Sequence, residues 1–146
     1  MIIEVRSEAE TQELAQKLGA ILRGGEIIEL RGDVGAGKTT FVKGLARGLK
    51  IDDDVQSPSF TISRVYDARD NLRLAHYDFY RLVDAGIMKD ELSEMMQDPE
   101  TITIIEWADI VEGVLPENRL TIHFESPTET SRTLTLQGDQ KLSEQL

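Results

Sequence analysis

The chain has 146 residues, a length typical of one domain, and its 27 acidic residues outnumber its 16 basic ones. The net charge of −11 argues against DNA or RNA binding by this chain alone, because such binding relies on Lys and Arg neutralising phosphates. The sequence contains no cysteine, which excludes disulfides, thiolate metal sites and a cysteine nucleophile.

The first third of the chain alternates β-rich runs with amphipathic segments. A strand is predicted over residues 1–6, followed by a helix that Ser7 caps. A second strand over 26–31 (EIIELR) leads directly into the glycine-rich segment 32–40, and a helix is predicted over 41–49. A strand, a glycine loop and a helix in succession form half of a βαβ unit, which predicts a parallel sheet covered by helices on both faces.

The middle of the chain is predicted to contain a loop, a hairpin and helical structure. The proline in the segment 57–60 (SPSF) keeps the residue before it out of the helical conformation and indicates a loop. Two β-rich runs, 61–66 and 72–77, flank the polar sequence DARDN, which predicts an antiparallel hairpin. Apolar residues at helical spacing over 79–97 predict one or two amphipathic helices.

The last third begins with the most apolar run of the chain. Residues 101–107 (TITIIEW) are almost continuous β-formers, as expected of a strand buried on both faces. A short helical piece over 108–115 and two strands over 119–124 and 132–136 complete the prediction.

The pattern contains no internal repeat or interdomain linker. We therefore expect one domain over residues 1–138 and a mobile, polar tail over 139–146. No apolar run approaches the roughly 18 residues of a membrane span. The acidic start MIIEVRSEAE is also unlike a secretory signal, so we expect a cytoplasmic protein without membrane contact.

Residues 32–39 (GDVGAGKT) match the phosphate-binding pattern G-x-x-x-x-G-K-[ST] in full. Such a loop presents backbone N–H groups, here those of Gly35, Ala36 and Gly37, to phosphate oxygens at a helix N-terminus. Lys38 is expected to neutralise the β- and γ-phosphates. The predicted fold is accordingly α/β, a P-loop NTPase-like domain with a mainly parallel sheet, helices on both faces and an antiparallel hairpin at its edge.

A phosphate loop also requires ligands for Mg²⁺. The Thr39 hydroxyl is expected to bind the ion, and Thr40 can donate a hydrogen bond to the α-phosphate. Two carboxylates end predicted strands, Glu106 after TITII and Asp78 after LRLAHY, and either is a candidate second ligand or a solvated strand end. Because no NKxD-type guanine-reading motif occurs, the favoured nucleotide is ATP.

His76 stands two residues before Asp78 and so points to the same side of the predicted strand. Two interpretations stay open. The histidine orients Asp78 or a water, or it is a core residue with a satisfied hydrogen bond. His123 lies in a terminal strand outside the motifs and is interpreted as structural.

Four segments occur in a specific order: GDVGAGKTT at 32–40, SPSFT at 57–61, HYDFYR at 76–81 and IEWAD at 105–109. Together they resemble the bacterial tRNA threonylcarbamoyladenosine biosynthesis ATPase family known as TsaE or YjeE. The resemblance implies a small P-loop ATPase that works with two partner proteins, TsaD and TsaB, to place a threonylcarbamoyl group on adenosine 37 of tRNA. It implies contact with tRNA only through that complex.

The resemblance also implies roles for individual residues. Lys38 and Thr39 would be the phosphate and Mg²⁺ residues, Glu106 a second Mg²⁺ contact, and Asp78 a catalytic or metal-linked acid. These assignments make Lys38, Asp78 and Glu106 the candidate catalytic residues.

Further family positions surround the expected nucleotide. The segment 57–61 would act as a switch loop that reports the γ-phosphate, with Ser59 where many relatives have Thr. The family pattern places Trp107 near the nucleotide, Thr11 near the adenine and Arg132 near the nucleotide.

Hydrolysis by the isolated chain is expected to be slow, because no arginine finger is obvious and supplying one is worth about 10³–10⁵ in rate in related systems. Arg64, Arg81 and Arg132 are the internal candidates. One alternative is a small-metabolite kinase, which the absence of arginine from 84–101 disfavours, since a kinase lid usually carries arginines. Another is a non-hydrolysing ATP-sensing subunit.

Overall fold

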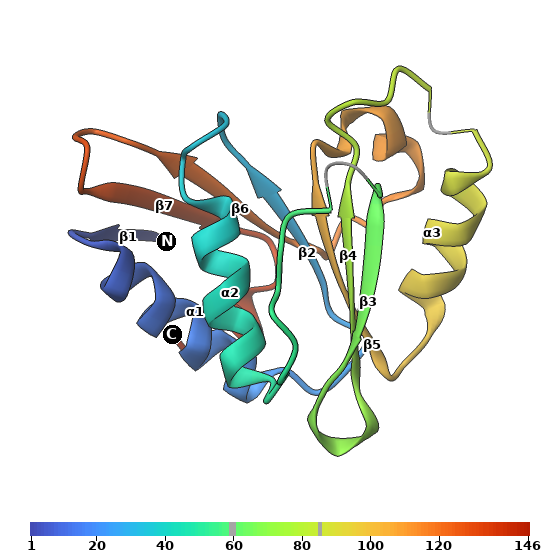
Figure 1. Ribbon diagram of the computed structural model, residues 1–146, viewed down its shortest axis with the longest axis horizontal. Helices are drawn as coiled ribbons and strands as arrows, with labels where there is room; N and C mark the ends of the chain where they lie inside the picture. The colour runs from blue at the N-terminus through green and yellow to red at the C-terminus, as the bar shows by residue number, and fades with distance from the viewer. Residues whose placement is uncertain (59–60, 85) are drawn as a thin grey trace.

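The computed structural model describes residues 1–58, 61–84 and 86–146. Within them a seven-stranded sheet has the order β1-β7-β6-β2-β5-β4-β3 (Figure 1). Its strands are β1 (Ile2–Val5), β2 (Ile27–Arg31), β3 (Ser63–Asp67), β4 (Arg73–Asp78), β5 (Thr101–Glu106), β6 (Leu120–Glu125) and β7 (Arg132–Gln137). The helices are α1 (Glu8–Ile21), α2 (Lys38–Gly48), α3 (Met88–Gln97) and α4 (Gln140–Ser143), with short 3₁₀ helices η1 (Arg69–Asn71) and η2 (Ala108–Val114).

The centre of the sheet is parallel and its margins are antiparallel. Strands β6, β2, β5 and β4 run parallel to one another. At one margin β3 pairs antiparallel with β4, and at the other β7 pairs antiparallel with both β6 and β1. The predicted α/β fold with an antiparallel hairpin at its edge is confirmed.

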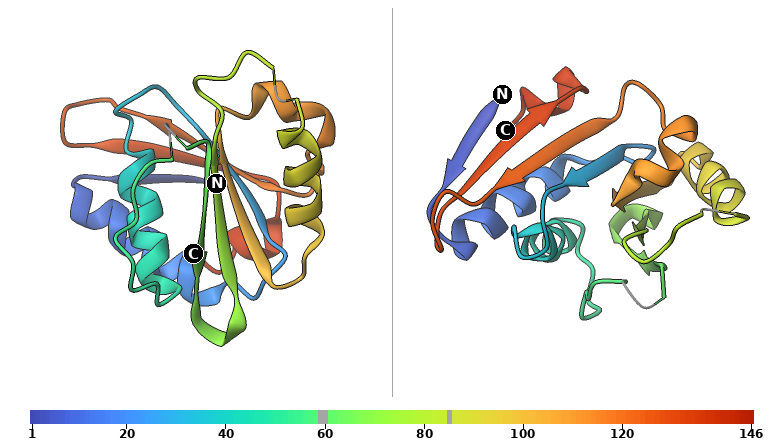
Figure 2. Two further views of the ribbon diagram at one scale, coloured as in Figure 1. Left: turned by 45° about the vertical axis from the view of Figure 1, so that its right-hand side comes forward. Right: turned by 90° about the horizontal axis from the view of Figure 1, so that it is seen from above.

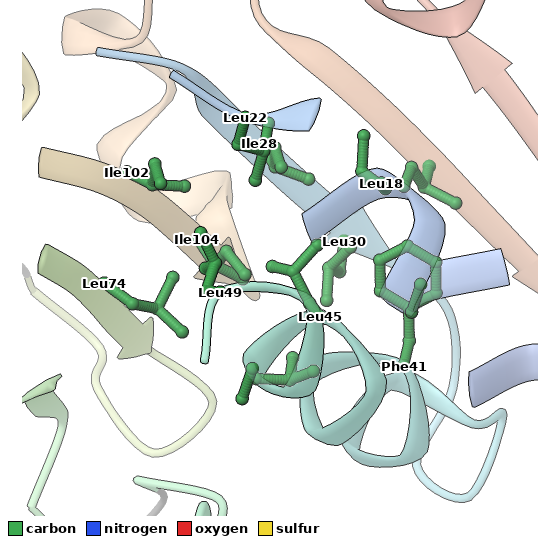
Figure 3. Packing of buried hydrophobic residues seen from close by; sticks show 14 of the residues in the cluster. Leu18, Leu22, Ile28, Leu30, Phe41, Leu45, Leu49, Leu74, Ile102 and Ile104 are labelled. Carbon is green, nitrogen blue, oxygen red and sulfur yellow. The ribbon is translucent and has the colours of Figure 1, made fainter. Parts of the chain in front are cut away.

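Successive side chains of a strand point to opposite faces of the sheet, so the core is divided between the two faces. In β5, Ile102 and Ile104 pack into the cluster that includes α1 and α2, whereas Ile105 packs into the cluster that includes α3 and η2. Figure 2 shows the helices on the two sides of the sheet, and Figure 3 shows the larger cluster. All six residues of β5 are buried, which confirms the predicted central strand.

Three glycines, Gly19, Gly44 and Gly48, let α1 and α2 approach each other closely. A Cβ added to Gly19 would lie 2.3 Å from the carbonyl oxygen of Leu45, and one added to Gly48 would lie 2.2 Å from that of Gln16. Any larger residue would therefore separate the helices. The close contact brings the N-terminal end of α1 beside the glycine-rich loop, where it contributes to the site described below.

Two helices differ from their predicted bounds. The structure starts α2 at Lys38, earlier than predicted, because the glycine loop passes directly into its first turn through Gly37, which has φ 104°. Among the described residues of 79–97, only Met88–Gln97 form an α-helix.

Within the part of the chain that the structure describes, no helix combines the length and apolar character needed to cross a bilayer.

The C-terminal segment 139–146 differs from the predicted mobile polar tail, since it contains α4 and packs against the core. Asp139 caps this helix by accepting a hydrogen bond from the backbone of Leu142, which is buried. Leu146 is partly buried against the same cluster, and its carbonyl oxygen accepts from Lys17 Nζ at 3.1 Å. Leu142 and Leu146 are four residues apart, so both can face the core, and the polar residues around them obscured this pattern.

Arg69 joins the β3–β4 hairpin to the C-terminal ends of α1 and α2. Its Nη2 donates to the carbonyl oxygens of Gly19 (2.9 Å), Ala20 (3.0 Å) and Leu22 (2.8 Å), and its Nε donates to that of Gly48 (3.4 Å). A guanidinium at this position satisfies carbonyls that a helix end leaves unpaired, and its charge suits the negative end of both helix dipoles.

Arg69→Ala is expected to lower the free energy of unfolding by about 2–3 kcal/mol, because four carbonyl oxygens lose a charged donor. Urea denaturation followed by circular dichroism measures this change. Arg23→Ala removes an exposed arginine near the end of α1 and should change stability by less than about 0.5 kcal/mol. Equal effects of the two substitutions would show that the helix-end contacts of Arg69 contribute nothing.

Candidate nucleotide-binding site

The candidate site lies at the edge of the sheet where β2, β4 and β5 end. Because these strands are parallel, their carboxyl ends meet there, which is where open α/β sheets bind ligands. Asp78 and Glu106 are partners in the β4–β5 register and end these two strands side by side. The loop that follows β2 carries the phosphate-binding motif and enters α2 at the same edge.

The phosphate loop has the conformation that its glycines permit. Gly35 and Gly37 have φ values of 83° and 104°, in the left-handed region that other residues rarely adopt. No side chain caps α2, so its first-turn N–H groups remain available to an anion. Ala36 differs from its prediction, since its N–H donates to the carbonyl of Asp33 at 3.0 Å and the residue is buried. This N–H group closes a turn within the loop.

A pocket of about 680 Å³ opens beside this loop and brings together residues from distant parts of the chain. Apart from Ala36, every predicted site residue lines it: Thr11, Gly35, Gly37, Lys38, Thr39, Thr40, Asp78, Glu106, Trp107 and Arg132. Sequence reasoning missed the N-terminal end of α1 and the β6–β7 loop, which contribute Arg6, Ser7, Glu8, Glu129 and Thr130. Only Thr11 and Arg132, through the family resemblance, pointed to these two segments.

Lys38 lies between the loop and the carboxylates. Its Nζ donates to the carbonyl oxygen of Gly32 at 2.6 Å and lies 3.9 Å from Glu106 Oε1. The same atom is 4.1 Å from the centre of the Trp107 ring, a cation–π contact. Burial lowers the pKa of Lys38, while the nearby carboxylates oppose the shift. The lysine thus places a positive charge where a phosphate group could replace water.

The two carboxylates are buried and held by different partners. Asp78 Oδ1 accepts from the backbone N–H of Tyr80 at 2.9 Å, and Oδ2 accepts from the Ser57 hydroxyl at 3.4 Å. Glu106 Oε2 lies 2.6 Å from Nε2 of His76. The structure therefore pairs His76 with Glu106 and not with Asp78. The other interpretation, a core histidine with a hydrogen bond, agrees with its burial and with this contact.

Trp107 lies where β5 ends and η2 begins. Its φ of 55° turns the chain sharply and brings its ring 4.7 Å from that of Tyr80, centroid to centroid. The two rings and Lys38 form one wall of the pocket. Trp107 is also the only tryptophan of the chain, so its fluorescence is an intrinsic probe of this wall.

Arg132 connects the β6–β7 hairpin to the phosphate loop. Its Nε donates to the carbonyl oxygen of Ala36 at 3.1 Å, and its Nη2 donates to that of Gly35 at 3.5 Å. Its Nη1 donates to carbonyl oxygens within its own hairpin. Of the other two arginine candidates, Arg81 lines the pocket, whereas Arg64 is exposed and is absent from the pocket lining.

The pocket offers oxygen donors suited to Mg²⁺. The hydroxyl of Thr39 and the carboxylates of Asp78 and Glu106 line the same space, and Mg²⁺ prefers such hard ligands. Within residues 1–58, 61–84 and 86–146, no group of three His, Cys, Asp or Glu side chains is arranged to hold a metal. The donor set therefore fits an ion that also takes ligands from phosphate and water, as Mg²⁺ commonly does.

Comparison with known proteins identifies the family of the chain. The family described as "Threonylcarbamoyl adenosine biosynthesis protein TsaE" matches residues 5–134. The chain belongs to the TsaE family. A Bacillus subtilis protein named tRNA threonylcarbamoyladenosine biosynthesis protein TsaE is 38% identical over 130 residues, which cover 86% of this chain and 78% of the relative. The Treponema pallidum protein of the same name is 36% identical over 131 residues, covering 90% of this chain and 96% of the relative.

A solved structure has the same fold as this chain. The crystal structure of Bacillus subtilis YdiB superposes with a TM-score of 0.80 at 32% identity, covering 99% of this chain and 91% of YdiB. The TsaE family acts in tRNA threonylcarbamoyladenosine biosynthesis, and its fold is a P-loop fold. Of the predicted TsaE switch loop 57–61, Ser59 lies outside the described residues, while Ser57 lines the pocket.

Proposed function

We propose that this TsaE protein binds ATP with Mg²⁺, hydrolyses it, and with partner proteins supports threonylcarbamoylation of adenosine 37 in tRNA. One observation carries the proposal: a single pocket contains the phosphate loop, Lys38, Thr39 and two buried carboxylates. Phosphoryl transfer depends on this combination of positioning and charge.

In this proposal Lys38 and the first-turn N–H groups of α2 bind the β- and γ-phosphates. Thr39 and Glu106 hold Mg²⁺, with Asp78 as a further candidate. Bound there, the ion would supply positive charge that stabilises the charge developing on the phosphate. Asp78 is held at Oδ1 by the Tyr80 N–H, so it can orient the attacking water. The water oxygen bonds to the γ-phosphorus as the bond to the β-phosphate oxygen breaks, which yields ADP, phosphate and a proton.

The proposed partners are TsaD and TsaB, with tRNA bound through the complex in the cytoplasm. The net charge of −11 suits a chain that docks on a basic protein surface better than on tRNA. Arg132 is a poor internal arginine finger, because its Nε, Nη1 and Nη2 already donate to backbone carbonyls. We therefore expect a slow basal rate that partners accelerate.

Three measurements test the proposal. Titration with ATP and Mg²⁺ should change the fluorescence of Trp107, and phosphate release should be slow alone and faster with TsaD and TsaB. In a mixture of the chain, both partners and tRNA, ATP should sustain nucleoside modification over many turnovers. A non-hydrolysable analogue should not sustain it.

The alternative functions correspond to other results of the same experiments. Equal modification with the analogue would make the chain an ATP-sensing subunit that does not need hydrolysis. Transfer of labelled phosphate to a metabolite would indicate a kinase. An unchanged Trp107 signal, together with absent phosphate release, would reject nucleotide binding altogether.

A further inference from the structure

His76 lies within β4 on the face of the sheet that α2 covers. Side chains two apart on a strand share a face, so His76 and Asp78 point the same way. In the pairing of β4 with β5, Asp78 lies opposite Glu106 and His76 lies opposite Ile104. Glu106 is therefore the diagonal neighbour of His76 on β5. This diagonal places Nε2 of His76 2.6 Å from Oε2 of Glu106.

The contact uses one Glu106 oxygen and leaves the other toward the pocket. A carboxylate can only accept, so Nε2 of His76 donates to Oε2. The second oxygen, Oε1, lies 3.9 Å from Lys38 Nζ. Holding one oxygen fixes the rotation of the carboxylate plane, so the free oxygen stays directed at Lys38 and at the expected metal position.

The environment of the imidazole supports a specific role for this contact. His76 is 1% exposed, and Nδ1 has no hydrogen-bond partner among the described residues. A histidine that only filled space in the core would have two ring nitrogens without hydrogen-bond partners, which is unfavourable when buried. In His76, one of the two nitrogens, Nε2, has Glu106 as its partner.

We propose that His76 is a positioning residue that orients Glu106 for Mg²⁺ bound with nucleotide. This inference rests on the proposed function, because it assigns Glu106 to the metal. His76 itself touches neither nucleotide nor metal in this proposal. Its loss should therefore weaken the contribution of Mg²⁺ to nucleotide binding while leaving metal-free binding intact. Removing such an outer partner of a metal ligand typically costs about 10–100-fold in metal affinity or activity.

The test compares His76→Leu, which removes the donor, with His76→Gln, whose side-chain amide can replace the Nε2–H group. Calorimetry measures binding of a non-hydrolysable ATP analogue by the full chain in EDTA and in excess Mg²⁺, and thermal melting verifies folding. The Mg²⁺ enhancement is the ratio of the affinity for the analogue in excess Mg²⁺ to the affinity in EDTA. In His76→Leu this ratio should fall at least about 10-fold, while the affinity in EDTA should stay within about two-fold of the unaltered protein. In His76→Gln the ratio should stay within about three-fold of the unaltered protein. If His76→Leu does not fold, His76→Asn, whose amide is too short to reach Glu106, carries the same expectation.

Three results would overturn the inference. They are an unchanged Mg²⁺ enhancement in His76→Leu, an equal loss in EDTA and in Mg²⁺, or a glutamine variant as impaired as the leucine variant. A fourth check uses Glu106→Gln as the background, in which His76→Leu should cause no further loss. A further loss there would show that His76 acts through another group. If the unaltered protein binds the analogue under neither condition, the proposed function fails, and the role of His76 fails with it.

Discussion

Replacing Lys38 with alanine is expected to reduce ATP hydrolysis by at least about 10²–10³-fold, the usual cost of removing one charge-stabilising donor. The variant loses the Nζ group that lies between the Gly32 carbonyl, Glu106 and Trp107. The fold should persist. Burial lowers the pKa of Lys38, which shows that the folded state bears a desolvation cost for this charge. The substitution also removes the cation beside the buried Glu106 carboxylate, so the free energy of unfolding should fall by about 1–3 kcal/mol while the variant stays folded.

Phosphate release and thermal melting test this expectation together. Lys43→Ala is the matched control, because Lys43 lies on α2 as well but is exposed outside the pocket. It should retain both hydrolysis and stability. Hydrolysis by Lys38→Ala at the rate of the control would refute the assignment of the pocket, whereas unfolding of Lys38→Ala would refute the argument from its burial.

Glu29→Gln should destabilise the protein by about 3–5 kcal/mol, the typical cost of removing one partner of a buried ion pair. Glu29 is fully buried in β2 and accepts from Arg31 Nε at 2.6 Å and Arg119 Nε at 2.8 Å. Arg119 Nη2 also donates to Glu112 of η2 at 2.7 Å, so the network joins β2, the start of β6 and η2. A glutamine in place of Glu29 would leave both guanidinium groups without their buried counter-charge.

Chemical denaturation measures the free energy of unfolding of Glu29→Gln and of Glu112→Gln. Both glutamates pair with Arg119, so the comparison isolates the effect of burial. The Glu112 side chain is 51% exposed, so its substitution should cost less than about 1 kcal/mol. Similar losses in the two variants would contradict the importance of the buried carboxylate.

The stability difference between the unaltered protein and Glu29→Gln should depend on pH. Burial acts to raise the pKa of Glu29, but its hydrogen bonds with Arg31 and Arg119 outweigh burial and lower the pKa below its ordinary value of 4.5. Folding therefore favours the ionised form. The advantage of the unaltered protein over Glu29→Gln should be complete above pH 4.5 and decline as the pH falls through the lowered pKa. A constant advantage down to pH 2 would exclude this linkage.

Local patterns in the sequence were sufficient to predict much of the fold and most of the site. The run TITIIE predicted a strand buried on both faces, and the motif at 32–39 predicted the turn into α2, because both depend on short-range periodicity and backbone freedom. Apart from Ala36, the predicted site residues line one pocket. Their chemical roles stay predictions.

Tertiary structure decided how these groups are paired. Only the β4–β5 register directs His76 to Glu106 instead of Asp78, because the choice depends on a diagonal contact between strands that are far apart in sequence. The close packing of α1 on α2 likewise brings Ser7 and Thr11 to the pocket, and Leu142 packs on the core because that surface is assembled from distant segments. The sequence by itself determined which residues are the candidates for the chemistry of the site, because motif spacing and strand ends are local features. Which of them touch one another depends on long-range packing, which no local pattern encodes.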